Sequence, residues 1–377
     1  MWARERAAYS VPEVAKALHK DLHLVEEWES GVSVPSYVEL EQLAYRLYKR
    51  PVAVFFFPSP PVEPDLKQSL RTLPESEIDN LTHDTRLALR QAKARQLALM
   101  ELNDGSNPSK RKVFRDIIAS FSADVVGTAK ELRKYIGVDL GQQVKWRNND
   151  IALKSWRALV EDVGVFVFKR SLEQEDVSGF CLHDAEFPII YLNNGSSETR
   201  QIFTLFHELS HVLLGTNGIT KRDDRYIESL GGDEKRIEVF CNSLTAEFLV
   251  PSGDFDERLA FMLRPWEDEA VSELARRYKV SREVILRRLL DRGKITPSHY
   301  QTKAHEWTMD YRRKKGSGGG DYYAKQAVYL GDKFLGLAFG RYYQGLYTRE
   351  QLADYLDVKV NSVAGLEQYM LEKASSR

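Results

Sequence analysis

The chain has 377 residues, of which 43% are hydrophobic and 29% are charged, and it carries 54 Lys and Arg against 55 Asp and Glu. This length exceeds what one hydrophobic core usually serves, so we expect more than one domain. The balanced charge excludes a chain-wide basic surface for nucleic acid or anionic membranes, and the two cysteines exclude a disulfide scaffold.

Neither the start of the chain nor its apolar runs predict a targeting or membrane segment. The first ten residues, MWARERAAYS, carry charge where a secretory signal would be apolar. The longest apolar run, at residues 53–58, is far shorter than the roughly 20 residues that a spanning helix needs. Together with the low cysteine content, this predicts a cytoplasmic protein with no membrane partner.

Residues 1–60 are predicted to form a small helical domain, because short helical patterns are followed by the proline-rich stretch FPSPPVEPD. In VPEVAKALHKDLHLVEEWESG, at residues 11–31, Ala15 would pack between two helices, and Leu18 and Val25 would enter the core. This pattern resembles the Xre/Cro family of helix-turn-helix domains, although the usual glycine of the turn is replaced.

The resemblance implies that the second helix of this motif enters a DNA major groove, but its charge opposes that role. The helix carries His23, Glu26 and Glu27, whereas neutralisation of phosphates by basic side chains dominates DNA affinity. Lys16 and Lys20 would then have to contact the phosphate backbone. Two functions stay open for this domain: DNA binding through these five residues, and docking of a protein partner.

One small sheet is the whole predicted β content. After a helical connector over residues 61–134, three turn-separated runs rich in Val, Ile, Phe and Tyr predict about three strands. These runs lie at residues 163–170, 177–184 and 186–194. With helices elsewhere, the fold class is predicted as α+β, mainly α.

The helix predicted over residues 198–214 contains the sequence HELSH, with His207, Glu208 and His211 in the pattern H-E-x-x-H. Two histidines four residues apart lie one above the other on a helix, so both imidazoles can bind one Zn²⁺. Glu208, about 100° further round the helix, can take a proton from the attacking water. The helix is otherwise apolar, and a buried histidine pair without a partner would be costly.

A catalytic zinc site needs a third protein ligand and an open fourth position. No further histidine follows closely, so we expect a carboxylate from the next predicted helix, at residues 234–250. Glu234 and Glu238 flank one edge of its apolar stripe, and Glu247 lies on the other flank beside Phe240. The periodicity does not distinguish Glu234 from Glu238.

The sequence around these residues resembles the ImmA/IrrE family of metallopeptidases. The similar runs are R-x-x-F-T-L-x-H-E-L-x-H-x-L-L, which begins at Arg200, and E-x-x-x-N-x-x-x-A-E-x-L-x-P, which begins at Glu238. The resemblance implies a zincin-like peptidase core at residues 135–255 with Glu238 as the third zinc ligand. Asn242, one turn further, would orient Glu238.

Other residues near this site are candidates with weaker support. Arg200 and Thr204 lie on the helical face that carries the two histidines and could contact a substrate, although pairing of Arg200 with a surface carboxylate is an equal alternative. The residue that stabilises the oxyanion is not distinguishable. Tyr191, Tyr226 and His183 are candidates by residue type alone.

Two further segments repeat the spacing of the N-terminal motif. Ala275 in ARRYKVSREVILRRL and Ala353 in ADYLDVKVNSVAGLE take the position of Ala15. Residues 256–310 are therefore predicted to contain a helix-turn-helix-like segment. Residues 311–377 are predicted to form a C-terminal helical region, interrupted by a flexible GSGGG joint.

The first of these segments is strongly basic. Residues 276–294 carry eight Lys or Arg and two acidic residues. Such a helix could contact phosphates, with Arg282, Arg287 and Arg288 as the DNA-binding candidates, and a solvated basic helix is the alternative.

The predicted function is zinc-dependent peptide hydrolysis, with His207, His211 and Glu238 as metal ligands and Glu208 as general base. The family resemblance implies a narrow substrate, such as a repressor or antitoxin-like partner in a stress, mobile-element or toxin–antitoxin circuit. The alternative is a DNA-binding transcriptional regulator or antitoxin that binds an operator or a small toxin-like protein, with the zinc fold as sensor or partner-binding scaffold. The oligomeric state is not predicted.

Overall fold

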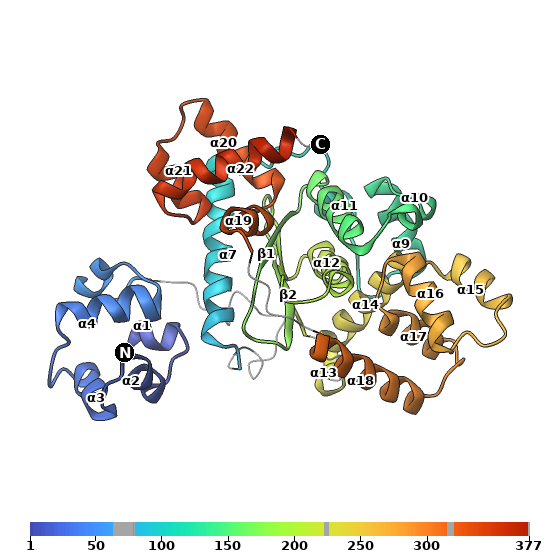
Figure 1. The fold of residues 1–377 in the computed structure, drawn as a ribbon, viewed down its shortest axis with the longest axis horizontal. Helices are drawn as coiled ribbons and strands as arrows, with labels where there is room; N and C mark the ends of the chain where they lie inside the picture. Colours follow the sequence, from blue (N-terminus) through green and yellow to red (C-terminus); the bar gives the residue numbers. More distant parts are fainter. Residues whose placement is uncertain (63–77, 79, 222–225, 315–319, 376–377) are drawn as a thin grey trace. The chain divides into compact units, whose positions relative to one another are not determined.

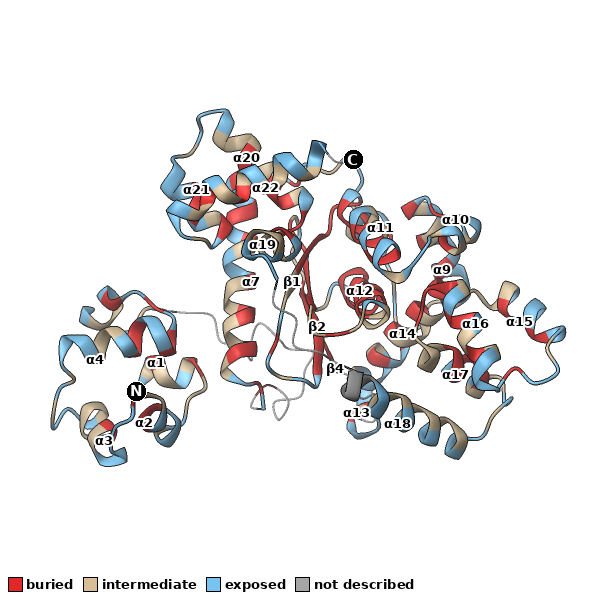
Figure 2. Ribbon diagram, in the orientation of Figure 1, coloured by how far each residue is buried: buried red, intermediate tan, exposed pale blue. Residues whose placement is uncertain are grey.

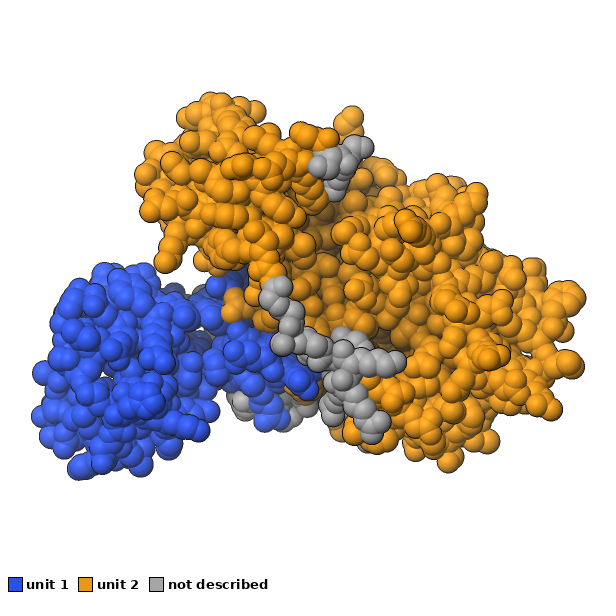
Figure 3. Space-filling model, viewed as in Figure 1, with its two compact units in different colours: residues 1–94, 172–175 blue, residues 95–171, 176–377 orange. Residues whose placement is uncertain are grey.

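The computed structural model describes residues 1–62, 78, 80–221, 226–314 and 320–375, and at residues 311–314 the backbone alone. The chain is mainly helical with one small mixed sheet, in agreement with the predicted α+β class (Figure 1). One compact unit comprises Met1–Ala94 and Leu172–Glu175, and the other comprises Arg95–Ser171 and Asp176–Arg377 (Figure 3). No helix in the described ranges combines the length and apolar content that crossing a membrane requires.

Helices account for most of the described residues in both units. The first unit contains α1 (Trp2–Arg6), α2 (Val11–Leu18), α3 (Leu22–Ser30), α4 (Tyr37–Glu41), the π-helical η1 (Gln42–Tyr48) and the 3₁₀-helical η2 (Val52–Phe56). The boundary between the units falls within α7 (His83–Leu102). The second unit adds α8 (Val113–Asp116), α9 (Val125–Ile136), α10 (Leu140–Lys145), α11 (Asn149–Asp162), α12 (Glu198–Leu213), α13 (Tyr226–Ser229), α14 (Gly232–Leu249), α15 (Ser252–Ala260), α16 (Asp268–Tyr278), α17 (Arg282–Asp291), α18 (Pro297–Lys314), α19 (Tyr322–Leu330), α20 (Asp332–Tyr343), α21 (Arg349–Leu356), η3 (Val360–Ser362) and α22 (Val363–Ser375).

The helix pair α2 and α3 forms where the N-terminal motif predicts it. Ala15, Leu18 and Val25 are buried, as expected for core positions. α2 ends at His19, which adopts a left-handed conformation with φ of 54°, and the N–H of Lys20 then donates to the Ala15 carbonyl at 2.9 Å. Glycine adopts this left-handed conformation more readily than other residues.

The same turn recurs twice in the second unit. Lys279, between α16 and α17, and Asp357, after α21, have φ of 58° and 55°. The N–H that follows each residue donates to the carbonyl of Ala275 or Ala353, at 3.1 and 3.0 Å. The alanine spacing in the sequence therefore marks three turns of one kind. The predicted GSGGG joint lies outside the described residues, except for Gly320.

The sheet has four strands in the described residues, one more than predicted. They are β1 (Phe166–Arg170), β2 (Val177–Leu182), β3 (Ile189–Asn193) and β4 (Gly218–Lys221), in the order β1-β3-β2-β4. β1 and β3 are parallel, and the other pairs are antiparallel. β4 escapes prediction because its four residues include one large apolar side chain, Ile219, which leaves no alternation to detect.

The sheet is covered on both faces, which explains why β2 and β3 are buried along their whole length (Figure 2). α12 packs against β2, β3 and β4, and α19 packs against β1. Gly179 allows α12 to approach, since a Cβ at this position would lie 2.6 Å from the Thr204 methyl carbon. On the far side of α12, Trp156, Phe206 and Phe248 pack together with ring centroids 4.3–5.4 Å apart and join α11, α12 and α14.

The C-terminal helices are attached to this core by a buried guanidinium. Arg157 on α11 donates to the Val328 carbonyl at 2.7 Å and pairs with Glu161 at 3.2 Å. Gly331, between α19 and α20, is required here because a Cβ would overlap the guanidinium. Phe334 then packs edge-on against Phe168 of β1, with ring centroids 5.3 Å apart. The C-terminal region is therefore part of the second unit's core.

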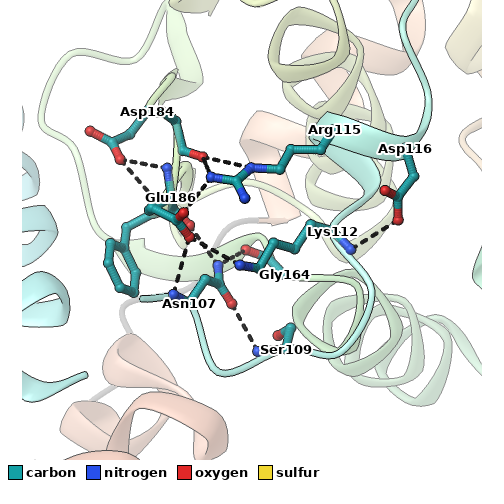
Figure 4. Close-up of polar contacts among 10 residues, drawn as sticks. Asn107, Ser109, Lys112, Arg115, Asp116, Gly164, Asp184 and Glu186 are labelled. Atoms are coloured by element: carbon teal, nitrogen blue, oxygen red, sulfur yellow. Dashed lines mark hydrogen bonds and ion pairs between the residues drawn. The ribbon is translucent and has the colours of Figure 1, made fainter. Parts of the chain in front are cut away.

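A carboxylate, Glu186, ties α8 to the turn between β2 and β3 (Figure 4). Its Oε2 accepts hydrogen bonds from the Asn107 N–H at 3.2 Å and from Lys112 Nζ at 3.1 Å, and Arg115 donates to its other oxygen. The Asn107 side chain also donates to the Gly164 and Glu186 carbonyls, at 2.8 and 2.6 Å. These bonds fix the chain that leads from α7 to α8 and the sheet.

A second buried ion pair joins α14 to α15 and α17. Glu247 accepts hydrogen bonds from the Ser252 N–H at 2.9 Å and the Ser252 hydroxyl at 2.5 Å. Arg288 on α17 donates to Glu247 at 2.7 Å, to the Val250 carbonyl at 2.8 Å and to the Ser252 hydroxyl at 2.9 Å. The second glutamate of the sequence motif on α14 is therefore an anchor for the helix pair that follows.

Replacing Arg288 with alanine is expected to lower the free energy of unfolding by about 3–5 kcal/mol, because Glu247 would stay buried without its partner. Arg287→Ala is the matched control: Arg287 is exposed and pairs with Asp291 on the surface, so its loss should cost less than about 1 kcal/mol. Urea unfolding of the two variants measures the difference. Equal midpoints would show that the buried pair contributes no stability.

Candidate metal centre

The histidines of the H-E-x-x-H sequence lie on α12 where it faces β4 and α14. α12 begins after Ser197, whose hydroxyl accepts a hydrogen bond from the backbone three residues on. Its apolar residues are buried against the sheet and against α11 and α14. His207, Glu208 and His211 are consequently enclosed, with 1%, 0% and 1% of their surface exposed.

Three side chains converge at one point, and they are the three predicted metal ligands. His207 Nε2 lies 3.2 Å from His211 Nε2. The two oxygens of Glu238, on α14, lie 3.3 Å from His207 Nε2 and 3.3 Å from His211 Nε2. This metal-ligand cluster contains Glu238 and not Glu234, which is one turn earlier on α14.

Both imidazoles are oriented by hydrogen bonds on their outer nitrogens. His207 Nδ1 lies 2.9 Å from the amide oxygen of Asn242, so Nδ1–H donates. His211 Nδ1 lies 3.2 Å from the hydroxyl oxygen of Thr216, which donates its own proton to the His211 carbonyl. These bonds orient both rings so that their Nε2 atoms face Glu238.

The expectation for Asn242 needs a correction. The resemblance assigns it to the orientation of Glu238, whereas its amide bonds to His207 instead. Asn242 lies one turn after Glu238 on α14, and its side chain contacts the His207 ring. Glu238 is oriented by a residue from α13, Tyr226, whose hydroxyl donates to Oε2 at 2.8 Å.

The cluster fits a tetrahedral cation. Two ligand atoms at ~2.0–2.1 Å from a tetrahedral ion are about 3.3–3.4 Å apart, close to the 3.2 Å between the two Nε2 atoms, and each Nε2 has one Glu238 oxygen at 3.3 Å. Two imidazole nitrogens and a carboxylate face one another in a buried space, where a proton or a bound cation must offset the carboxylate charge. Two imidazoles and one carboxylate are a donor set that suits Zn²⁺ and leaves one position open.

The pKa values in the cluster show how strongly the three groups interact. Burial lowers the pKa of His207 and of His211, but the Glu238 carboxylate outweighs burial and leaves both above the ordinary value. Burial raises the pKa of Glu238, and the two imidazoles more than reverse this effect, so that its pKa lies well below the usual range. The cluster therefore attracts positive charge.

Glu208 is held with one oxygen anchored and the other available. Oε1 accepts hydrogen bonds from the Thr220 N–H at 3.0 Å and from the Thr220 hydroxyl. Oε2 is buried and accepts no hydrogen bond from the described residues. Gly218 allows β4 to pass this oxygen, because a Cβ there would lie 2.9 Å from Oε2 and 2.6 Å from His211 Cδ2. Thr220 and Gly218 were not among the predicted site residues, because β4 was not predicted. The short sequence GIT after α12 has no pattern that would identify them.

The three residues proposed by type for oxyanion stabilisation have different surroundings. Tyr191 stacks on Phe180, with ring centroids 5.0 Å apart, on the sheet face opposite α12. His183 follows β2, and its N–H donates to the Asn217 side chain. Tyr226 is the one that contacts the metal-ligand cluster, through Glu238.

The two further residues on the α12 face have structural partners. Thr204 is fully buried, and a Cβ at Gly179 of β2 would lie 2.6 Å from its methyl carbon. Arg200 pairs with Glu283 of α17 at 3.6 Å. This pairing agrees with the alternative interpretation of Arg200 as the partner of a carboxylate.

The DNA-binding candidates of the first unit are dominated by acidic neighbours. His23 lies 3.5 Å from Glu26 and 3.7 Å from Glu27, on the exposed face of α3. Lys20 pairs with a carboxylate of α4 at 2.5 Å, and Lys16 is exposed on α2. The surface of α3 therefore presents negative charge.

The basic segment of the second unit does not form the exposed face that its composition suggests. Arg282 lies over the Trp307 ring, 4.2 Å from its centroid, and Arg287 pairs with Asp291 at 3.2 Å. The expectation that Arg288 lies on a surface open to phosphates is wrong, because its guanidinium is buried in the ion pair with α14. The helical pattern places charges along a helix but does not show which of them other helices will cover.

Asn242→Ala is expected to weaken metal affinity by about 10- to 100-fold without unfolding the protein, because the His207 ring loses the acceptor that sets its tautomer. Ser243→Ala, at the next position of α14, is the matched control. Competition with a chromophoric chelator measures both affinities. An Asn242→Ala variant that binds zinc as tightly as the Ser243→Ala variant would contradict this role.

Comparisons with known proteins agree with this site. Residues 160–290 match the peptidase family model described as the IrrE N-terminal-like domain. The chain is 34% identical over 140 residues to the radiation response metalloprotease IrrE of Deinococcus deserti, which covers 37% of this chain and 47% of that protein. The chain thus matches about half the length of this curated relative. Residues 160–290 are therefore similar to the IrrE N-terminal-like peptidase domain.

A solved structure is also similar over part of its length. A Mycobacterium tuberculosis transcriptional regulator matches with 20% identity over 44% of this chain and 46% of that chain. The TM-score is 0.30, which is too low to establish a common fold.

Proposed function

We propose that this chain is a zinc-dependent metallopeptidase that cleaves a specific protein partner, of the repressor or antitoxin type. One observation carries the proposal: His207, His211 and Glu238 converge at the separations of a tetrahedral site, beside the buried carboxylate of Glu208. The IrrE-like match over residues 160–290 supports the same reaction class.

The chain's own residues provide the proton transfers of peptide hydrolysis. When bound, Zn²⁺ would act as a Lewis acid that lowers the pKa of a water molecule and polarises the scissile carbonyl. Thr220 holds Oε1 of Glu208, which leaves Oε2 to take the proton from the water as its oxygen attacks the carbonyl carbon. The same oxygen then gives the proton to the amide nitrogen as the C–N bond breaks.

The burial of the site supports a narrow substrate range. None of the four residues is more than 5% exposed, so access of a polypeptide to them is restricted. A peptidase of bulk protein needs an open cleft, whereas an enzyme for one partner does not. The helix-turn-helix shape of α2 and α3 supports a binding role for the first unit, in keeping with an Xre-like regulatory domain.

A regulator is the second candidate function, and the same burial supports it. In this case the zinc fold is a sensor or scaffold, and the Xre-like domain binds an operator or a partner protein. A scaffold requires metal but no access for a peptide. The peptidase therefore requires the Glu208 carboxylate as a general base, whereas the regulator does not.

The decisive experiment compares newly formed protein N-termini in cells that produce the wild-type chain or the Glu208→Gln variant at equal levels. The peptidase proposal expects one or a few new N-termini that are present with the wild type and absent with the variant. The partner should be cleaved again when it is purified and mixed with the zinc-loaded chain. Identical N-termini in both cells would favour the regulator.

A further inference from the structure

An exposed apolar surface lies on the first unit, and we define it by α3, the loop that follows and α4. Large apolar side chains of this α3–α4 surface are accessible to solvent. Their exposed fractions are 43% for Leu22, 77% for Val32, 83% for Val34, 62% for Tyr37 and 61% for Val38. Figure 2 shows exposed residues on both helices. Clustered apolar exposure of this kind is typical of an interaction site.

The structure brings the two ends of this surface together. Lys20, directly before α3, pairs with Glu39 in the first turn of α4 at 2.5 Å. The loop between the helices is attached to the end of α3 by a hydrogen bond from the Val32 N–H to the Glu27 carbonyl at 3.0 Å. The Lys20–Glu39 pair therefore places the start of α3 near the first turn of α4.

The charge around these apolar residues has one sign. Residues 21–45 contain six acidic residues and no lysine or arginine. Glu29 pairs with Arg4 of α1, and Glu39 pairs with Lys20. The other four lie on or beside the surface, and they are Asp21, Glu26, Glu27 and Glu41.

This charge opposes DNA, the docking partner that a helix-turn-helix shape suggests first. DNA presents one negative charge per ~1.7 Å of its axis, and its affinity for proteins comes from Lys and Arg contacts to phosphates. α3, the loop and α4 provide none of these side chains. An acidic face with exposed valines gains nothing from a phosphate backbone and is repelled by it.

We propose that the α3–α4 surface docks a polypeptide segment in which lysine or arginine side chains flank apolar ones. The apolar side chains would bury Val32, Val34 and Tyr37, which provides most of the affinity. The basic side chains would pair with Glu26 and Glu27, which selects the partner and speeds its association. Charge complementarity is the observation that identifies this partner. The proposal holds whether or not the second unit is an active peptidase.

The test uses the full chain with Glu208→Gln, so that a bound peptide is not hydrolysed. The probe is a short labelled peptide with leucine on one helical face and lysine on the other, and fluorescence anisotropy measures its binding. Glu26→Lys/Glu27→Lys is expected to weaken binding by about tenfold or more, and Val32→Ser/Val34→Ser by a similar factor. Labelled duplex DNA is expected not to bind the parent chain under the same conditions.

Matched variants in the second unit provide the controls. Glu269→Lys/Glu273→Lys, on exposed positions of α16, changes the net charge by the same amount. Phe261→Ser/Leu263→Ser removes apolar side chains that are 91% and 96% exposed. Both are expected to bind the peptide like the parent chain.

Four results would overturn the proposal. The first is that the parent chain does not bind the peptide, and the second is that the control variants lose as much affinity as the α3–α4 variants. The third is that duplex DNA binds more tightly than the peptide and is released by salt. The fourth is that the parent chain sediments as a dimer that Val32→Ser/Val34→Ser dissociates, because the occupant would then be a second copy. None of these readings depends on peptide hydrolysis, so the proposed peptidase function is tested separately.

Discussion

The Glu208→Gln variant is expected to hydrolyse its protein substrate about 10²- to 10⁴-fold more slowly than the wild-type chain, which is the usual contribution of a general base. The amide has the shape of the carboxylate but cannot accept the proton of the attacking water. Initial rates with purified, zinc-loaded protein and the partner identified from its cleaved N-terminus measure the effect.

The control for this variant is its metal content, which should equal that of the wild type because Glu208 is not a member of the metal-ligand cluster. Glu234→Gln, on α14 but outside the cluster, should keep the wild-type rate. A Glu208→Gln variant with full metal and an unchanged rate would show that another group takes the proton.

Zinc is expected to co-purify at about one atom per chain, and His207→Ala or Glu238→Ala should remove it. The loss of an outer partner of a ligand already costs roughly 10- to 100-fold in affinity, so the loss of a ligand itself should cost more. Elemental analysis gives the metal content, and chelator competition gives the affinity of each variant.

Glu234→Ala is the matched control for the Glu238→Ala variant, since both remove a carboxylate from the same helix. It should bind zinc like the wild type. Full occupancy in the Glu238→Ala variant with loss in the Glu234→Ala variant would reassign the third ligand. Wild-type protein that neither contains zinc nor binds it tightly would contradict the catalytic proposal itself.

Residue spacing along the chain was sufficient for the features that one helix or one turn determines. Two histidines four residues apart share a helical face wherever that helix packs, so His207 and His211 were identifiable as a pair. The alanine spacing likewise marked the turns after α2, α16 and α21, because the backbone N–H that bonds to each alanine carbonyl lies five residues away. Three of the four strands were detectable from their apolar runs.

The choice between Glu234 and Glu238 needed more than the period of α14. Both glutamates flank one edge of its apolar stripe, and the family resemblance favoured Glu238 without a geometric reason. The angle and register at which α14 packs against α12 place Glu238 beside the histidines. The same packing places the Asn242 amide beside His207, whereas the resemblance had assigned Asn242 to the orientation of Glu238.

The sequence by itself therefore determined the two histidines that share one face of α12, the position of Glu208 between them and the helices α12 and α14, because these depend on local spacing. Only the tertiary structure decided which oxygen of Glu208 is anchored, since Thr220 comes from a strand that has no sequence signal. It also decided that Arg288 is buried, because Glu247, its partner, lies 41 residues away in the chain. Long-range packing determines these features, and no periodicity within one element encodes them.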